Sequence, residues 1–217
     1  FYERAGNVVN LNGSTGSVSV IGAVSPPGGD FSEPVTQNTL RVTKTFWALD
    51  ARLAQRRHFP SINWLTSYSL YKEALDEWFS DHVAGDWMAT VNELMFILQE
   101  EEKLLEIVQL VGSDALPEKQ QLILEVARLI REFVLQQNAY HDVDTFSELD
   151  KTYKIMKTIL LFRELAEKAL EDEVGIQAII NTRAKEGIAN AKFEKDYAKV
   201  LLKAENEMTG EFSALGQ

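Results

Sequence analysis

Residues 121–135 read Gln-Leu-Ile-Leu-Glu-Val-Ala-Arg-Leu-Ile-Arg-Glu-Phe-Val-Leu. Apolar residues recur in this stretch every three or four positions, which is the spacing of one face of an α-helix. The residues that form this face are Leu122, Val126, Leu129, Ile130, Phe133 and Val134. The stretch therefore predicts a helix with one apolar face, and other elements are needed to bury that face.

Three other segments carry the same spacing and can supply the partners. They run from Leu94 to Val111, from Leu149 to Ala166 and from Tyr197 to Ala204. Gly112 and Pro117 mark a turn between the first of these segments and residues 121–135. Because such faces are buried most simply against one another, we expect an antiparallel helical bundle over residues 68–217.

Residues 1–67 differ from the rest of the chain in composition. They contain four of the five prolines and half of the twelve glycines, which favour turns over long helices. The β-branched run Val18–Val24 predicts a buried strand. Residues Leu40–Leu49 predict either a second strand or a helix that passes into a strand. The predicted fold is therefore mostly α, with a small α/β part over residues 1–67.

The net charge of −11 is spread unevenly along the chain. Residues 1–71 hold four acidic and six basic side chains, whereas the remaining 146 residues hold 29 acidic and 16 basic ones. An acidic second region argues against nucleic acid as a partner, since phosphate contacts need clustered Lys and Arg. There is no cysteine, and no apolar run is long enough to span a bilayer, so we predict no direct membrane insertion.

The motifs of a self-sufficient enzyme are not found in this sequence. The phosphate-binding motif Gly-x-x-x-x-Gly-Lys-Ser/Thr is absent. The histidines His58, His82 and His141 are isolated from one another, and the Glu100–Glu102 run is typical of a solvated helix face. We therefore predict no catalytic residue and no metal ligand.

Two runs in the first region indicate a ligand site instead. Residues 25–36 read Ser-Pro-Pro-Gly-Gly-Asp-Phe-Ser-Glu-Pro-Val-Thr, a loop whose shape is set by proline and glycine. Residues 55–64 read Gln-Arg-Arg-His-Phe-Pro-Ser-Ile-Asn-Trp, and Phe59 before a proline can present a flat ring to a nucleotide. From the residues alone, Phe59 could also lie in the core, and Tyr140 could simply be an aromatic at the end of a helix.

These runs closely resemble the catalytic A subunit of the V-type and archaeal A-type rotary ATPases. Further similar runs are Phe1–Gly6, Phe46–Asp50, Leu98–Glu102, Glu106–Gly112 and Phe133–Asn138. The resemblance covers most of the chain and weakens in its last helices. The non-catalytic B subunit of the family has an acidic run where this chain has residues 26–34, so the resemblance is to the catalytic type and not to the non-catalytic one.

The resemblance implies that the chain is the C-terminal part of a longer subunit. Residues 1–67 would be the last strands of a RecA-like nucleotide-binding domain, followed by a helical C-terminal domain. Phe59 would stack on adenine, Tyr140 would close the other side of the base, and Gln137 and Asn138 would line the same pocket. ATP or ADP with magnesium would bind to the full-length subunit, whereas this chain alone would bind neither tightly and would be inactive.

The resemblance also implies the partners of the subunit. They are B subunits in an alternating hexamer and the central-stalk subunits, in a complex that couples ATP hydrolysis or synthesis to proton or sodium transport. The subunit would be peripheral, on the cytoplasmic side of the membrane. The turn that would contact the rotor consists of Asp114, Ala115, Leu116, Pro117 and Glu118, although these residues also fit an ordinary interhelical turn. The alternative function is a stand-alone acidic helical interaction module without nucleotide binding.

Overall fold

The stretch that predicts the apolar helix face forms helix α5 (Glu118–Ile130), which continues into a turn of π-helix, η4 (Arg131–Leu135). The computed structural model describes residues 1–183 and 185–216. The predicted face of α5 is buried, since its four apolar side chains are at most 3% exposed: Leu122, Val126, Leu129 and Ile130. Phe133 and Val134 in η4 pack, partly buried, against the same core. This helix prediction is confirmed.

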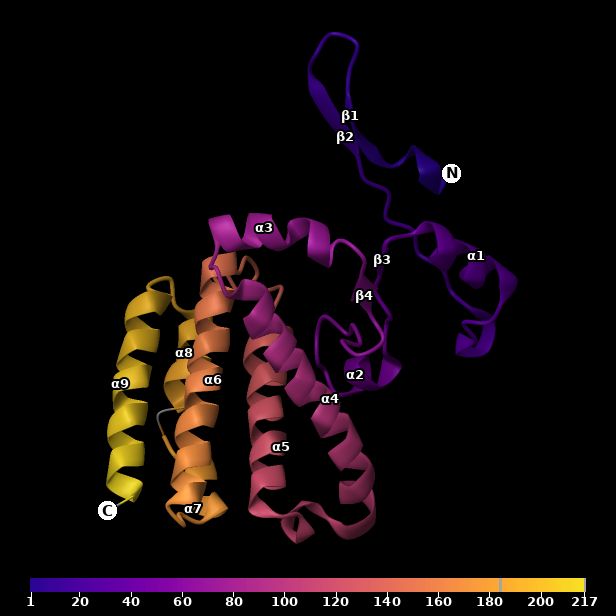
Figure 1. The fold of residues 1–217 in the computed structure, drawn as a ribbon. Helices are drawn as coiled ribbons and strands as arrows, with labels where there is room; N and C mark the ends of the chain where they lie inside the picture. Colours follow the sequence, from indigo (N-terminus) through magenta and orange to yellow (C-terminus); the bar gives the residue numbers. More distant parts are fainter. Residues whose placement is uncertain (184, 217) are drawn as a thin grey trace.

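The other three predicted helices are also present, and three shorter ones complete the bundle. The predicted helices are α4 (Trp87–Val111), α6 (Leu149–Glu171) and α9 (Tyr197–Leu215). The shorter ones are α3 (Lys72–His82), α7 (Ile176–Ile180) and α8 (Lys185–Phe193). Figure 1 shows α4, α5, α6 and α9 side by side, with α3 across one end and α7 at the other. Among the described residues, no helix is both long and apolar enough to cross a bilayer.

The helices share one apolar core. Helices α5, α6, α7, α8 and α9 each contribute side chains at 0% exposure, among them Leu129, Ile159, Phe162, Ile179, Ile188 and Met208. Helices α8 and α9 lie especially close together at Gly187, where a Cβ atom would lie only 2.5 Å from the Cβ of Ala204. The bundle is therefore packed without room for an extra methyl group at this position.

The chain begins with an extended part that projects away from the helices (Figure 1). A short 3₁₀ helix, η1 (Tyr2–Arg4), leads into an antiparallel hairpin of β1 (Gly6–Val9) and β2 (Thr15–Val18). The prediction of a buried strand over Val18–Val24 is wrong, because only Val18 belongs to a strand and Ile21 is 85% exposed. The β-branched residues favour extended backbone, but the hairpin has only two strands and neither is buried.

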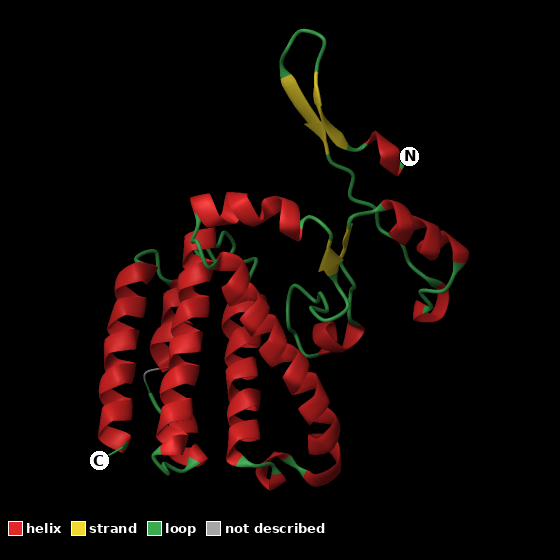
Figure 2. Cartoon of the chain, viewed as in Figure 1, coloured by secondary structure: helices red, strands yellow, loops and turns green. Residues whose placement is uncertain are grey.

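A second set of short elements connects the hairpin to the bundle. They are η2 (Pro27–Gly29), α1 (Pro34–Val42), β3 (Thr45–Phe46), α2 (Ala51–Gln55) and β4 (Tyr68–Ser69). Strands β3 and β4 pair antiparallel. All strands of the described residues lie within residues 1–69 (Figure 2). Of the two alternatives for Leu40–Leu49, the helix passing into a strand is the one observed. Trp64 and Leu65 pack against the core of the bundle and join the two parts.

Candidate functional site

The loop that carries Phe59 is held at its base by Asp50. This residue caps α2, since its Oδ1 accepts a hydrogen bond from the Arg52 amide at 2.8 Å. Its Oδ2 accepts one from the side-chain amide of Asn63 at 3.1 Å, which holds the pKa of Asp50 below its usual value. The Phe59–Pro60 peptide bond is cis, and the Phe59 side chain is 52% exposed. The loop therefore presents an aromatic ring at the surface instead of burying it in the core.

His58 anchors the inner side of the same loop. Its ring lies 5.5 Å from that of Trp64, and its Nε2 is buried without a hydrogen-bond partner among the described residues. Burial lowers the pKa of His58, and the positive charges of Arg131 and Lys192 lower it further. At neutral pH the ring is therefore uncharged, and it packs beside the ring of Trp64.

A second loop, residues 136–147, meets the Phe59 loop directly. It follows the π-helical turn η4, and the Gln137 amide donates a hydrogen bond to the Phe59 carbonyl oxygen at 2.8 Å. The side-chain amide of Gln136 reaches the Arg57 carbonyl oxygen at 3.4 Å. These contacts bring together two segments about 80 residues apart in the chain. They place the four predicted pocket residues on adjoining loops, with Gln137, Asn138 and Tyr140 on one and Phe59 on the other.

The polar side chains of the second loop mostly stabilise the loop itself. Gln137 donates through Nε2 to the Asp144 carbonyl oxygen at 2.7 Å. Asn138 accepts a hydrogen bond at its Oδ1 from the Tyr140 amide at 3.0 Å. The Tyr140 side chain is 98% exposed, so the ring is accessible to a ligand. The structure thus leaves two aromatic rings available at this site, while Gln137 and Asn138 shape the loop.

Two buried charged residues, one on this loop and one on α8 beside it, were not predicted from the sequence. Asp144 is 2% exposed and Lys192 is 7% exposed. Nothing in their local sequence marks them as buried, because Asp and Lys are usually on the surface. Lys192 meets Asp144 from 48 residues further along the chain, so only the folded structure brings the two together.

The predicted rotor-contacting turn lies between α4 and α5, at the end of the bundle opposite α3 (Figure 1). Asp114, Ala115 and Pro117 are exposed, but Leu116 is buried at 6% exposure. Glu118 is exposed, and its Oε1 accepts a hydrogen bond from the Ile176 amide at the start of α7. The turn is therefore anchored by Leu116 and Glu118 and presents mainly backbone and short side chains to solvent.

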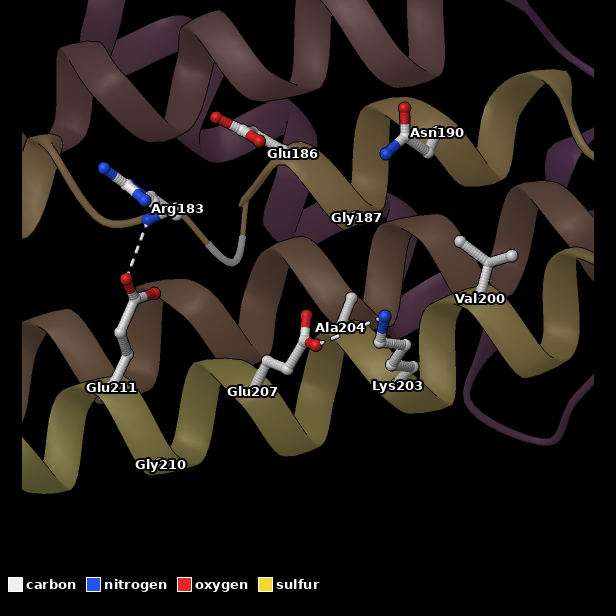
Figure 3. Close-up of a pocket in the computed structure, with 10 residues that line it drawn as sticks. All are labelled: Arg183, Glu186, Gly187, Asn190, Val200, Lys203, Ala204, Glu207, Gly210 and Glu211. Atoms are coloured by element: carbon white, nitrogen blue, oxygen red, sulfur yellow. Dashed lines mark hydrogen bonds and ion pairs between the residues drawn. The ribbon is translucent and has the colours of Figure 1, made fainter.

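A groove of about 480 Å³ lies elsewhere, between α8 and α9 (Figure 3). Its walls carry mixed charge, with Lys203 paired to Glu207 at 3.5 Å and the Arg183 amide bonded to Glu211. None of the predicted site residues lines it. Within residues 1–183 and 185–216, no group of three or more His, Asp or Glu side chains is arranged to hold a metal ion.

Comparison with known proteins accounts for both parts of the chain. Residues 1–69 match the family model for the nucleotide-binding domain of the ATP synthase alpha/beta family, and residues 76–180 match that for the C-terminal domain of V and A type ATP synthase. The A subunit of the A-type ATP synthase from Methanoregula boonei is 59% identical over 99% of this chain. The chain belongs to the A-subunit family of V- and A-type ATP synthases. The A subunit of the A-type ATP synthase from Methanosarcina acetivorans is 57% identical over the whole of this chain.

The chain covers only part of its relatives in this family. It spans 37% of the length of both of these A subunits. Among solved structures, the ATP synthase subunit NeqB from Nanoarcheaum equitans matches 75% of this chain and 37% of its own, with a TM-score of 0.61 and 22% identity. That likeness concerns the fold alone.

Proposed function

We propose that this chain supplies the adenine side of the nucleotide site in the A subunit of a rotary ATP synthase. The observation that carries the proposal is the hydrogen bond from the Gln137 amide to the Phe59 carbonyl oxygen, at 2.8 Å. It supports the proposal because it joins the two loops whose aromatic rings, Phe59 and Tyr140, are exposed. A base between two such rings gains stacking energy on both faces.

The remaining groups of the site belong to other parts of the subunit in this proposal. The chain has no phosphate-binding motif, so the P-loop, the magnesium ligands and the catalytic groups would come from the rest of the relatives' length. ATP or ADP with magnesium is the ligand of the complete subunit. This chain alone is then expected to bind nucleotide weakly and to show no ATP hydrolysis.

The complete subunit would work within a larger assembly. We propose that it alternates with B subunits in a hexamer, and that the hexamer drives or follows a central stalk, coupling ATP hydrolysis or synthesis to proton or sodium transport. Its place would be at the cytoplasmic side of the membrane, as a peripheral part of the complex. The exposed turn residues Asp114, Ala115 and Pro117 are the proposed contact with the stalk, with Leu116 and Glu118 anchoring the turn.

Substitution of Phe59 tests the adenine pocket. Phe59→Ala in the full-length subunit is expected to weaken ATP binding about 5- to 150-fold, because base–aromatic stacking contributes roughly 1–3 kcal/mol. The dissociation constant can be measured by isothermal titration calorimetry. Phe146→Ala is a matched control, since Phe146 is an aromatic of the second loop that is 85% exposed and outside the proposed pocket. Unchanged ATP affinity in Phe59→Ala would refute the stacking assignment.

The alternative of a stand-alone interaction module is less well supported. It explains the acidic bundle, but it leaves unexplained why a nucleotide-binding family model matches residues 1–69 directly before the helical domain. ATP binding by the full-length subunit that depends on Phe59 would decide against it.

A further inference from the structure

A buried ionic cluster lies beneath the loop that carries Tyr140. It consists of Asp144 on that loop, Lys192 on α8 and Lys151 on α6, which are 2%, 7% and 3% exposed. The Lys192 ammonium lies 3.8 Å from the Asp144 carboxylate, and the Lys151 ammonium donates to the Lys192 carbonyl oxygen at 2.5 Å. The cluster therefore ties two helices of the bundle to one loop.

Lys192 holds the backbone just before the loop. Its Nζ donates to the carbonyl oxygens of Glu132 at 2.9 Å and Gln136 at 2.5 Å. These oxygens lie in and just after η4, where a helix end leaves carbonyl groups without helical partners. An ammonium with three donors can satisfy both of them and still face Asp144. The position of Gln136 is thereby set by a side chain from α8.

Asp144 holds the backbone just after that point. Its Oδ2 accepts a hydrogen bond from the Asn138 amide at 2.6 Å, and its carbonyl oxygen accepts one from the Gln137 side chain at 2.7 Å. Gln136 and Asn138 flank Gln137, whose amide binds the Phe59 carbonyl oxygen. The cluster therefore forms hydrogen bonds with the backbone on both sides of Gln137, the residue that binds the Phe59 loop.

The charges in this cluster are costly to bury. Burial lowers the pKa of Lys192, and the Asp144 carboxylate opposes that effect. Buried ion pairs usually add little net stability over apolar residues of similar size. The presence of the Lys192–Asp144 pair is better explained by specificity than by stability. The hydrogen bonds of these two side chains are satisfied in only one arrangement of the loop backbone, and the pair therefore favours that arrangement.

We propose that Lys192 and Asp144 are positioning residues for the nucleotide: they hold the loop of residues 136–147 so that Tyr140 faces the base stacked on Phe59. This inference rests on the proposed adenine pocket. The two residues contact the loop backbone and do not touch the nucleotide. Without them the loop samples other positions, and the apparent affinity falls in proportion to the time it spends in the competent one.

The test uses Lys192→Met and Asp144→Ala in the full-length subunit. Two ligands are compared by calorimetry, ATP with magnesium and inorganic tripolyphosphate with magnesium, which lacks a base. If the loop keeps its competent position one tenth of the time, the dissociation constant for ATP rises about tenfold. The constant for tripolyphosphate stays unchanged, because the cluster does not act on the phosphate side. A loss of general stability would weaken the binding of both ligands.

Lys185→Met provides the matched control. Lys185 lies on the same helix, its side chain is 11% exposed, and its Nζ pairs with Glu125 at 2.5 Å, away from the loop. Lys185→Met is expected to lower the melting temperature and leave ATP affinity unchanged. The double variant Lys192→Met/Asp144→Asn removes both charges, so it is expected to be more stable than Lys192→Met while still binding ATP weakly. It carries the test if Lys192→Met does not fold.

The outcomes separate the positioning role of Lys192 and Asp144 from the adenine pocket itself. If Phe59→Ala weakens ATP binding but the double variant and Asp144→Ala do not, the positioning role is refuted and the adenine pocket stands. If Phe59→Ala leaves ATP affinity unchanged, the pocket itself is wrong and the inference falls with it. Equal losses for ATP and tripolyphosphate, or a loss of ATP affinity in Lys185→Met, would also overturn the positioning role.

Discussion

Replacing Gly187 with alanine tests how closely α8 and α9 approach each other (Figure 3). The added methyl carbon would lie 2.5 Å from the Ala204 Cβ and 3.3 Å from its Cα. Carbon atoms attract one another best at about 3.5–4.0 Å, so the two helices would have to separate by roughly 1 Å. The main obstacle is the Ala204 Cβ atom, which is fixed to the backbone of α9 and cannot rotate away as the end of a long side chain could.

Two opposing effects determine the size of the change. Overpacking of this kind costs about 1–3 kcal/mol, and a clash with an atom that cannot rotate away favours the upper half of that range. Alanine is about 1 kcal/mol more favourable than glycine inside a helix, which offsets part of the cost. We therefore expect Gly187→Ala to lower the free energy of unfolding by about 1–2 kcal/mol. For a chain of this size the melting temperature would fall by roughly 2–8 °C.

Urea unfolding followed by circular dichroism at 222 nm measures this effect. Gly210→Ala on α9 is the matched control, because a Cβ atom there has none of the described heavy atoms within 4 Å. That control is expected to raise stability by up to about 1 kcal/mol, through helix propensity alone. The combination Gly187→Ala/Ala204→Gly should recover part of the loss, since it returns the space between the helices. A Gly187→Ala variant as stable as the parent would show that α8 and α9 are not in contact at this point.

Two further predictions concern ionisable groups in the bundle. Burial raises the pKa of Glu125, but hydrogen bonds from Arg128 and Lys185 outweigh it and hold the pKa below its usual value. Glu125→Gln is therefore expected to cost about 3–5 kcal/mol at pH 7, because it leaves the buried Lys185 ammonium without its ionic partner. The difference from the parent should begin to shrink as pH falls below about 4, where the glutamate of the unfolded parent chain takes up a proton while the folded one, with its lowered pKa, does not. A difference that stays constant in urea unfolding down to pH 3 would contradict this. The hydrogen bond to Asp86 raises the pKa of Tyr153 to about 12. Asp86→Asn should therefore return the pKa of this one tyrosine toward about 10, which an absorbance titration at 295 nm can measure. An unchanged titration curve would rule out the contact.

The helical part of the fold could be predicted because its signal is local. The spacing of Leu122, Val126 and Leu129 is visible within one stretch of sequence, and such a face is buried wherever the partner helices are. The Val18–Val24 run misled the prediction for the opposite reason. Whether a β-branched run is buried depends on neighbouring strands and helices, and these are not encoded in the run itself.

The candidate site could be predicted only in part. Phe59 and Tyr140 are predicted as pocket residues through the resemblance to a family, and the structure adds that their loops meet through the Gln137 amide. The roles of Gln137 and Asn138 in shaping the loop could not be predicted. Their partner Asp144 is only six or seven residues away, but the sequence does not indicate that this aspartate is buried, and its hydrogen bonds to them depend on that burial. Lys192 could not be found at all, since its contacts span 48 to 60 residues of sequence.

The continuity of α5 and η4 has a mechanical consequence. Residues Glu118–Leu135 run without interruption from the exposed turn at Pro117 to the loop at Gln136, over a length of about 25 Å. A tilt of roughly 10° about the loop end would carry the turn through about 4 Å. Because helical structure continues from Glu118 to Leu135, a displacement of the turn by several ångströms would change the angle of this segment beside Gln136, the residue next to the hydrogen bond between Gln137 and Phe59.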